Sequence, residues 1–480
     1  GSTKGSERMS AAIAAGLVAL AGVAFLIGWH RINGPFGESH DGRNAAVWVY
    51  AADGIDAHGL VGSRLGATRA SGEVYANHPP LVGVATWVAS KVTGRRPVGI
   101  RAPAVLGSLA SLLLLYLLGR SAGIGRIASA LGVAAAGATP MFRVYGAMVD
   151  TAMLSLPFGL AMLLAWRRAA AGRPWSPVLV ASVTAIALLS GWQVWLTVAV
   201  VVVGLVWQRV CREHRGWLPV SIGAVVGVVA VCSWEWWATG SLANLVDQFT
   251  IRSVGTTHVS WRQWLEAQRS FFGDLFPVAL LVLGLGGIVV GLVHRSSRSL
   301  IAALVGITVP WVLLLRNGSF IHDYWAYWLT APLAIGVAVL AHRAASLASR
   351  AGSPRARAVL ASVAGLGALA WAVTASPSSA QRRIDQGMVA ARLVERAHWQ
   401  AEQTRAWCVG GNCVFAPWLE FITGRPPGRV ATADELATLG RDHPTDLVLV
   451  SSWNRPAWLD AQTPPGYLLV AASTLKTQPP

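Results

Sequence analysis

The chain has 480 residues, of which 54% are hydrophobic and 13% are charged. Soluble proteins carry roughly a quarter charged residues, so this composition excludes an ordinary soluble domain. The net charge of +17 does not indicate nucleic-acid binding, because most arginines lie in short links between apolar segments, the pattern of the positive-inside rule. The sequence therefore predicts a polytopic α-helical membrane protein whose partner is the lipid bilayer, with no nucleic acid.

About eleven apolar segments approach the roughly 20 residues that a helix needs to cross a bilayer core. In chain order they are 10–29, 102–119, 125–142, 149–166, 176–190, 194–208, 217–237, 276–293, 299–315, 325–341 and 358–375. Residues 1–8 (GSTKGSER) read as a cloning remnant before a native start at Met9.

The stretch 177–208 decides the orientation of the later segments. It is long for one span and short for two. Two helices turning at 190–193 collect most of the arginine-rich links on one side, whereas a single helix divides them between both faces. We therefore expect two helices here, a cytosolic N-terminus and an extracytoplasmic C-terminus. The excess of Arg over Lys, with much Ala and Gly, is typical of a high-GC genome, so we expect a multi-pass protein of a bacterial cytoplasmic membrane.

The extracytoplasmic face is then expected to hold four connecting segments and a C-terminal tail. The connections are a long first loop, 31–101, and the shorter 143–149, 239–275 and 316–324. We predict a membrane domain over residues 9–376 and a small extracytoplasmic α/β domain over 377–480.

The tail is more polar than the rest of the chain. Residues 446–451 and 467–472 are predicted strands, and Thr432-Ala-Asp-Glu435 is a capping box that opens a short helix. Cys408 and Cys413 have four residues between them, and an extracytoplasmic location permits a disulfide that closes this loop.

The first loop carries acidic and basic side chains directly after the first apolar segment. Glu38, His40, Asp41 and Arg43 precede residues 45–52, which are predicted to form an amphipathic helix along the interface. A carboxylate at a helix start is stabilised by the unpaired N–H groups, so Asp41 is a candidate N-cap. It is equally a candidate general base that takes a proton from a hydroxyl group, and the two roles are compatible.

Two further motifs lie at predicted helix ends on the same face. His78 belongs to Tyr75-Ala-Asn-His-Pro-Pro-Leu81, where consecutive prolines favour a rigid corner. Asp150 starts the helix after 140–149 and is preceded by Arg143. An acid at membrane depth is costly unless it is paired or lines a wet cavity, so Asp150 is either a helix cap with an Arg partner or a functional acid.

The last motif is at the outer end of the segment 325–341. An interfacial aromatic belt explains its Trp and Tyr residues but not the His322-Asp323 pair that precedes Tyr324. The loop 239–275 adds Arg252, His258, Arg262 and Arg269. Arg on the outer face indicates either a solvated amphipathic helix or an anionic partner such as phosphate.

Taken together, these motifs resemble the GT-C superfamily of membrane glycosyltransferases. The likeness is to bacterial relatives of the protein O-mannosyltransferases and of the lipid A aminoarabinose transferase, and it covers about residues 10–345. It implies a GT-C fold and a hexosyl- or pentosyltransferase that moves a sugar, with inversion, from a polyprenyl-phosphate donor to a cell-envelope acceptor (glycan, lipid or protein).

The resemblance also implies residue roles. Asp41 becomes the general base, with Glu38 and His40 beside it, and Asp150 becomes a second acid that orients the acceptor or assists a cation. The candidates for binding substrate or the lipid phosphate are Glu38, His40, Arg43, His78, Arg143, Arg269, His322, Asp323 and Tyr324. The two named families typically show adjacent Asp-Glu where this chain has His40-Asp41, so the sugar and acceptor stay open. The sequence shows no metal-ligand spacing, and a divalent cation is left open.

Two other functions fit an outward-facing membrane protein. The first is a transporter or flippase of a lipid-linked sugar, and the second is a structural assembly subunit. Transporters place ionisable residues near the bilayer midplane, often in repeats. Here the predicted helix interiors are nearly free of charge apart from Glu235, which favours the enzyme.

Overall fold

The computed structural model is mostly helical. It describes residues 2–173, 175–211, 217–255, 259–348, 377–400, 405–409, 417–423, 427–451, 459–460 and 467–477.

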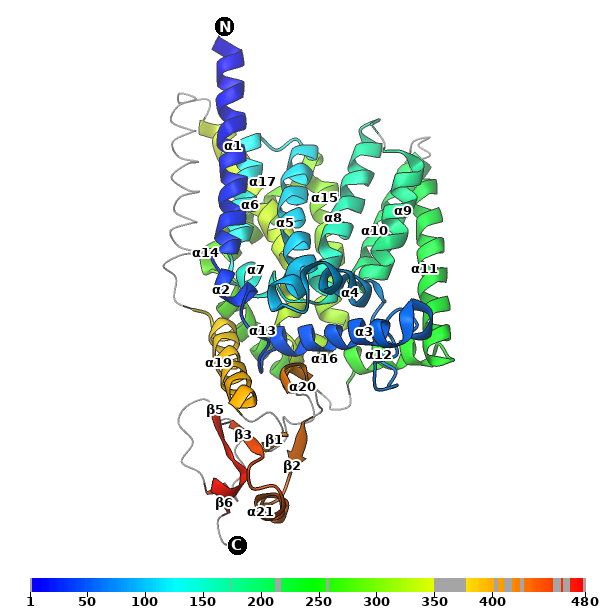
Figure 1. Ribbon diagram of the computed structural model, residues 1–480. Coiled ribbons are helices and arrows are strands. Elements are labelled where there is room, and N and C mark those ends of the chain that lie inside the picture. The colour runs from blue at the N-terminus through cyan, green and yellow to red at the C-terminus, as the bar shows by residue number, and fades with distance from the viewer. Residues whose placement is uncertain are drawn as a thin grey trace.

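Long apolar helices form a bundle in the middle of the molecule (Figure 1). They are α1 (Ser2–Leu26), α5 (Pro97–Ser121), α6 (Arg126–Ala138), α8 (Thr151–Ala170), α9 (Pro177–Ser190), α10 (Gln193–Cys211), α11 (Trp217–Thr239), α14 (Val278–Val293), α15 (Arg295–Leu314) and α17 (Thr330–Ala348). Each corresponds to one of the predicted apolar segments. The remaining segment, 358–375, lies outside the described residues.

Five helices of the described chain are long and apolar enough to cross a membrane on their own. They are Glu7–Leu26, Pro97–Ser121, Leu218–Thr239, Arg295–Leu314 and Asp323–Leu347. A sixth is formed if Trp261–Leu275 and Val278–Val293, bent by 107°, count as one span. The structure thus establishes a multi-pass membrane protein, while the expected eleven spans stay a prediction.

The stretch 177–208 forms two helices, as predicted. Helix α9 ends at Ser190 and α10 begins at Gln193. The intervening Gly191 is tightly enclosed, because a Cβ there would lie 2.9 Å from Oε1 of Gln193 and 3.0 Å from Cβ of Thr151. Small residues also let α14 and α17 approach closely: a Cβ at Gly287 would overlap the carbonyl of Gly336.

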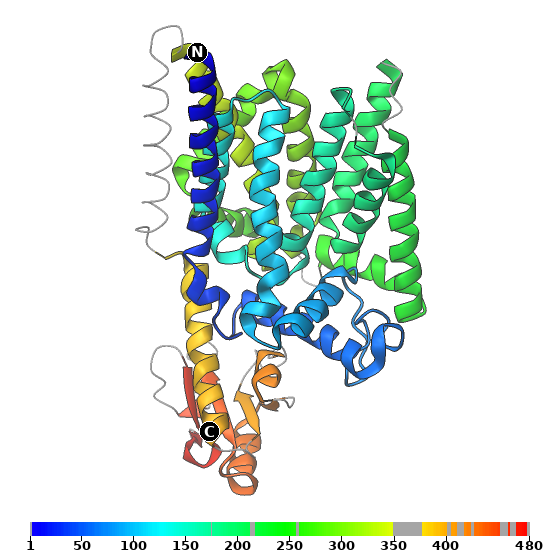
Figure 2. The same cartoon turned by 45° about the horizontal axis from the view of Figure 1, so that its top comes forward.

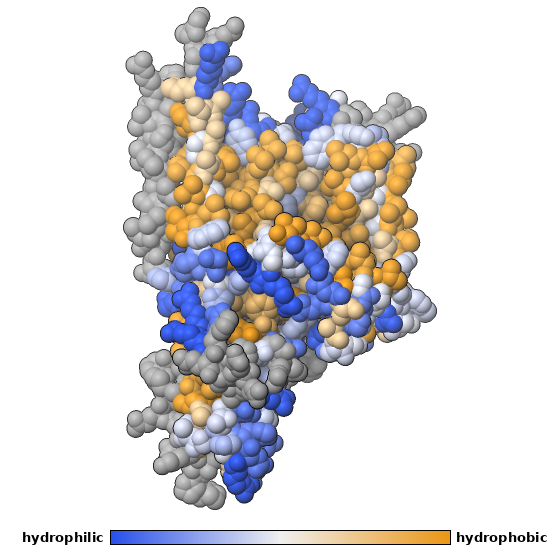
Figure 3. All heavy atoms as spheres, viewed as in Figure 1, coloured by the Kyte–Doolittle hydropathy of each residue, from blue (hydrophilic) through white to orange (hydrophobic). Residues whose placement is uncertain are grey.

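Shorter helices lie across one end of the bundle (Figure 2). They are α2 (Trp29–Ile32), α3 (His40–Gly62), α4 (Leu81–Thr93), α7 (Pro140–Tyr145), α12 (Ala243–Ser253), α13 (Trp261–Leu275), α16 (Arg316–Ile321) and the 3₁₀ helix η1 (Asp323–Leu329). Figure 3 shows the apolar band of the bundle above hydrophilic side chains at this end. These helices bring all the sequence motifs to one end of the molecule.

The described part of the tail contains a small sheet and three α-helices. The helices are α19 (Ser379–Gln400), α20 (Pro417–Thr423) and α21 (Ala433–Asp442). The sheet has the order β2-β1-β3-β5, formed by Gly428–Val430, Ala406–Val409, Leu447–Ser451 and Tyr467–Ala471. Strand β1 pairs in parallel with β2 and β3, and β5 is antiparallel to β3. The short strands β4 (Leu459–Asp460) and β6 (Lys476–Thr477) form a separate pair, and η3 (Ala472–Thr474) follows β5.

The two predicted strands in the tail and the Thr432–Glu435 capping box are confirmed. Cys408 lies on β1, whereas Cys413 lies outside the described residues, so their pairing stays a prediction. The tail is joined to the first loop by a common core: Phe36 and Trp48 pack in one cluster with Val394 and Trp418. This core fixes α19 and α20 against α3.

Candidate active site

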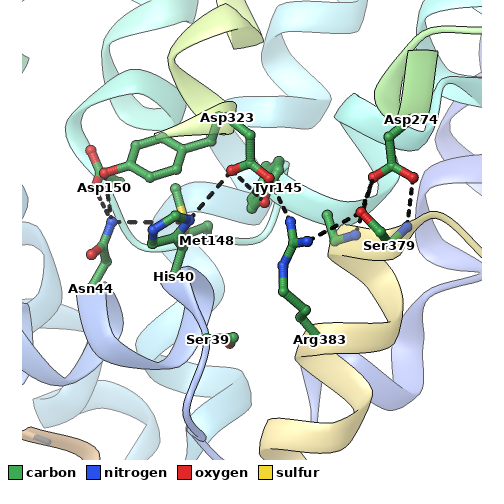
Figure 4. Close-up of polar contacts among 12 residues, drawn as sticks. Ser39, His40, Asn44, Tyr145, Met148, Asp150, Asp274, Asp323, Ser379 and Arg383 are labelled. Atoms are coloured by element: carbon green, nitrogen blue, oxygen red, sulfur yellow. Dashed lines mark hydrogen bonds and ion pairs between the residues drawn. The ribbon is translucent and has the colours of Figure 1, made fainter. Parts of the chain in front are cut away.

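Asp323 is the centre of a polar cluster that three separate elements build (Figure 4). Its side chain is only 3% exposed. Oδ1 accepts a hydrogen bond from the Tyr145 hydroxyl of α7 at 2.7 Å and lies 3.3 Å from Nδ1 of His40 at the start of α3. Nη2 of Arg383, on α19, donates to Oδ2 at 2.9 Å. A buried charge is tolerated only when it is paired and hydrogen-bonded, and Asp323 is both.

A second acid, Asp150, lies beside this cluster. It caps the following helix, which was part of one of its two expected roles: its side chain accepts from the backbone N–H of Ala152 at 3.5 Å and from the Thr151 hydroxyl at 2.9 Å. Nδ2 of Asn44 donates to Asp150 at 2.5 Å and to the Tyr324 hydroxyl at 3.1 Å. Asn44 thus ties α3 to both α8 and η1.

Two histidines and an arginine form the third part of the site. The rings of His40 and His322 are 5.1 Å apart, and Nη1 of Arg252 is 3.5 Å from Nε2 of His322. The Arg252 guanidinium also lies 5.8 Å from the Trp325 ring centroid. No acidic side chain among the described residues forms an ion pair with Arg252, and a guanidinium without such a partner is well suited to bind an oxyanion.

Burial sets the charge of two of the predicted phosphate ligands. It lowers the pKa of His78 to about 3, with a smaller contribution from the Arg252 charge. Burial also lowers the pKa of His322, and the neighbouring His40 and Arg252 act in the same direction. Nδ1 of each ring is buried and has no hydrogen-bond partner among the described residues. Near neutral pH both side chains therefore act as neutral hydrogen-bonding groups.

Asp41 points into a different environment. Its carboxylate, 6% exposed, accepts from Nη2 of Arg101 at 2.7 Å, and Arg101 is 1% exposed. The same guanidinium donates to the carbonyls of Ile32 and Gly34 at 3.2 and 2.6 Å. The N-cap interpretation of Asp41 is wrong, because helix α3 is capped by the side chain of Ser39. Asp41 lies in the first helical turn and its ion pair fixes the first loop to α5.

The other predicted residues lie around the cluster or away from it. Glu38 and Arg43 form an ion pair of 2.8 Å beside His40. Arg143, on α7, lies near Arg31 of α2, and burial together with this like charge lowers its pKa. Arg269 is exposed on α13, where no contact in the described part of the chain joins it to the cluster.

Sequence reasoning missed several members of the site. Asn44 lies one helical turn after His40, which was a readable signal for a shared helix face. Tyr145 stands inside the motif that leads to Asp150. Arg383 carried no signal, because more than 50 residues separate it from Asp323 in the chain and only packing of α19 brings it near.

Among the described residues, no group of three His, Cys, Asp or Glu side chains is placed to hold a metal ion. The carboxylate oxygens of Asp323 and Asp150 already accept hydrogen bonds from Tyr145, Arg383 and Asn44.

Comparisons with known proteins agree with this architecture. Residues 77–237 match the profile of the family described as dolichyl-phosphate-mannose-protein mannosyltransferase. No curated protein matches the sequence. The crystal structure of ArnT from Cupriavidus metallidurans bound to undecaprenyl phosphate is similar, with a TM-score of 0.60 at 14% identity, covering 95% of this chain and 97% of that chain.

A second similar structure is the archaeal oligosaccharyltransferase AglB from Archaeoglobus fulgidus in complex with an inhibitory peptide and a dolichol-phosphate. It has a TM-score of 0.54 at 11% identity and covers 91% of this chain and 69% of that chain. Both neighbours share the arrangement of helices described above. The chain therefore has the overall fold of these two membrane proteins, and about a third of it matches the mannosyltransferase family profile.

Proposed function

We propose that the protein is a glycosyltransferase that moves a sugar from a polyprenyl-phosphate donor to an extracytoplasmic acceptor with inversion. The observation that carries the proposal is the cluster itself: Asp150, Asp323, His40, His322 and Arg252 converge where the short helices meet the apolar bundle. A lipid-linked sugar presents its phosphate at this depth. The ligands named for ArnT and AglB, undecaprenyl phosphate and dolichol-phosphate, support a donor of this class.

The phosphate is assigned to Arg252 and its neighbours. A guanidinium binds two phosphate oxygens at once and stays charged when buried. His322 contacts Arg252, and His78 lies near enough for the Arg252 charge to lower its pKa. With neutral rings, both histidines contribute N–H groups rather than charge. Stabilising the negative charge that develops on the departing phosphate is commonly the largest catalytic contribution.

The reaction follows from these positions. The acceptor oxygen attacks the anomeric carbon, the new C–O bond forms, and the bond from that carbon to the phosphate oxygen breaks. Its electron pair goes to the phosphate, and a base in the first turn of α3 takes the hydroxyl proton. The resemblance to known families implies Asp41 for this role, while Asp150 and Tyr324 orient the acceptor through Asn44. Attack opposite the leaving group inverts the anomeric centre.

Location completes the proposal. We place the protein in a bacterial cytoplasmic membrane with the N-terminus in the cytosol, so that α3, α12 and the tail face outward. The arginine-rich links at the other end of the bundle support this orientation. The sugar, hexose or pentose, and the acceptor, protein, glycan or lipid, are not assigned.

The test uses purified full-length protein in proteoliposomes with a panel of polyprenyl-phosphate sugars and a crude cell-envelope acceptor fraction. The expected result is release of polyprenyl phosphate together with a glycosylated acceptor, detected by mass spectrometry. Arg252→Gln should abolish both, whereas Arg262→Gln, an exposed arginine on α13, should leave both unchanged. Movement of lipid-linked sugar between leaflets without any transfer would contradict the enzyme and favour a transporter.

A further inference from the structure

The first turn of α3 carries two neighbouring residues able to take a proton. His40 and Asp41 are adjacent, so their side chains project about 100° apart around the helix. His40 reaches Asp323 on one side, and Asp41 reaches Arg101 on the other. Only one of these directions leads to the cluster that holds Asp150, His322 and Arg252.

Asp41 is committed to structure. The nearer carboxylate oxygen is occupied by the Arg101 guanidinium at 2.7 Å, and both side chains are almost wholly buried. Arg101 is held in turn by two backbone carbonyls and by the ring of Phe36, 4.6 Å from its Cζ atom. An acceptor hydroxyl could use Oδ2 of Asp41 only by displacing this guanidinium.

The other acids of the cluster are also occupied by donors. The oxygens of Asp150 accept from Asn44, Thr151 and the N–H of Ala152. Those of Asp323 accept from Tyr145 and Arg383. Both carboxylates thus already accept hydrogen bonds, whereas a general base needs a free lone pair that faces the substrate hydroxyl.

His40 has the opposite properties. Its side chain is 31% exposed, and one nitrogen, Nδ1, faces the Asp323 carboxylate at 3.3 Å. A carboxylate only accepts, so in the neutral ring this hydrogen bond requires the hydrogen on Nδ1, and the lone pair is then on Nε2. Nε2 makes no hydrogen bond to any described residue. The neighbouring His322 ring, 5.1 Å away, contacts Arg252 and so places the phosphate side of the site next to the imidazole.

We propose that His40, oriented by Asp323, is the general base of the transfer and that Asp41 is a positioning residue. The inference rests on the proposed function and replaces the assignment of Asp41 as base, which the family resemblance implies. In the reaction, the acceptor O–H proton passes to Nε2 of His40 as the oxygen bonds to the anomeric carbon, and the bond to the phosphate oxygen breaks with its electron pair leaving on the phosphate. The imidazolium is stabilised by Asp323 and returns its proton to water after the product leaves. Arg383 and Tyr145 keep the Asp323 carboxylate in place.

The first test compares two variants of His40 with a control variant further along the same helix. His40→Gln should lower kcat by a hundredfold or more, the usual contribution of a general base, with donor KM nearly unchanged. His40→Ala should regain part of its activity when free imidazole is added. His58→Gln, an exposed histidine further along α3, is the matched control and should match wild type.

Asp41 needs a variant that does not leave Arg101 buried and unpaired. The double variant Asp41→Asn with Arg101→Gln replaces the ion pair by two amides and should keep kcat within about tenfold of wild type. The folded fraction of every variant is measured by size-exclusion chromatography. Full activity of His40→Gln overturns the assignment of His40, and an inactive but folded double variant would then assign the base role to Asp41. In either case, sugar transfer by wild type still supports the proposed function. If wild type transfers sugar from none of the donors, both the proposed function and the assignment of His40 are contradicted.

A pH profile gives a readout that structural damage would not mimic. An imidazole base predicts that activity is lost on the acid side at a higher pH than with a carboxylate base, which predicts a plateau down to about pH 4. The groups that face His40 are Asp323 and Tyr324 on η1, His322 before η1, and, one contact further, Arg252, Tyr145 and Arg383. Asp323→Asn should displace the acid limb, and a limb that stays near pH 4 in wild type contradicts the proposal.

Discussion

Arg383 donates from its Nη2 atom to the buried carboxylate of Asp323 at 2.9 Å, although the two residues lie 60 positions apart in the chain. Arg383 belongs to α19, the first described helix after the membrane bundle. The C-terminal segment is thus a structural part of the candidate active-site cluster.

Removal of this contact should slow the reaction without weakening donor binding. In Arg383→Gln, the Asp323 carboxylate keeps Tyr145 and His40 but loses its charged partner. We expect kcat to fall about tenfold, ~1.4 kcal/mol in the barrier, with an unchanged donor KM. Arg392→Gln, exposed on the same helix, is the control in steady-state kinetics. Equal losses in both variants would assign the effect to α19 as a whole.

The position of α19 depends on a glycine contact with the first loop. A Cβ at Gly387 would lie 2.9 Å from the backbone nitrogen of Glu38, and a Cβ at Gly37 would overlap the Gly387 carbonyl. Gly387→Ala should therefore push α19 away from the loop and reproduce the kinetic defect of Arg383→Gln. Gly273→Ala on α13, where a Cβ meets nothing within 4 Å, should be silent. Wild-type kinetics for Gly387→Ala would show that α19 tolerates displacement.

The buried Asp41–Arg101 pair should act mainly on stability. Removal of one partner leaves an uncompensated buried charge, so Asp41→Asn should cost about 3–5 kcal/mol of unfolding free energy, seen as a lower Tm in detergent. Adding Arg101→Gln should restore most of the loss. Asp53→Asn breaks the more exposed Arg95 pair in the same loop and should cost at most about 1 kcal/mol. A Tm for Asp41→Asn equal to that of wild type would contradict the buried pair.

Acid should destabilise the protein through His78. Its pKa is about 3 in the folded chain, against 6.5 as its usual value, because burial disfavours the charged ring. Between these limits the unfolded chain binds the additional proton, so stability is fully present above about pH 6.5 and is lost as pH falls toward 3. Wild type should therefore lose more Tm between pH 7 and pH 4 than His78→Gln does. Equal losses of Tm in the two proteins would show that His78 is not buried in the folded chain, and would contradict this prediction.

The sequence was most informative where chemistry and spacing are local. Apolar runs located the bundle helices, and the charge distribution separated 177–208 into α9 and α10. The sequence also predicted that the motifs around His40, Asp150 and His322 lie near one another, because the expected topology puts these helix ends on the same face of the membrane. Ser39, not Asp41, is the N-cap of α3, because its hydroxyl accepts a hydrogen bond from the backbone N–H of Gly42. Asp41 therefore lies inside the first helical turn.

What the sequence could not supply was long-range pairing. Arg101 reads as an ordinary helix-start arginine until folding buries it against Asp41. Arg383 reads as a polar residue of the tail, and nothing in its neighbours indicates a partner in η1. Such pairings depend on how whole helices pack. The motifs could therefore indicate which side chains belong to the site, but not which role each of them has.

The most direct test of the proposed function is an electron cryo-microscopy map of the full chain with a polyprenyl phosphate bound in a lipid nanodisc. The account predicts a phosphate within hydrogen-bonding distance of the Arg252 guanidinium and next to His322, with the prenyl chain leaving along the apolar bundle. A phosphate bound elsewhere, with Arg252 and His322 unliganded, would contradict it.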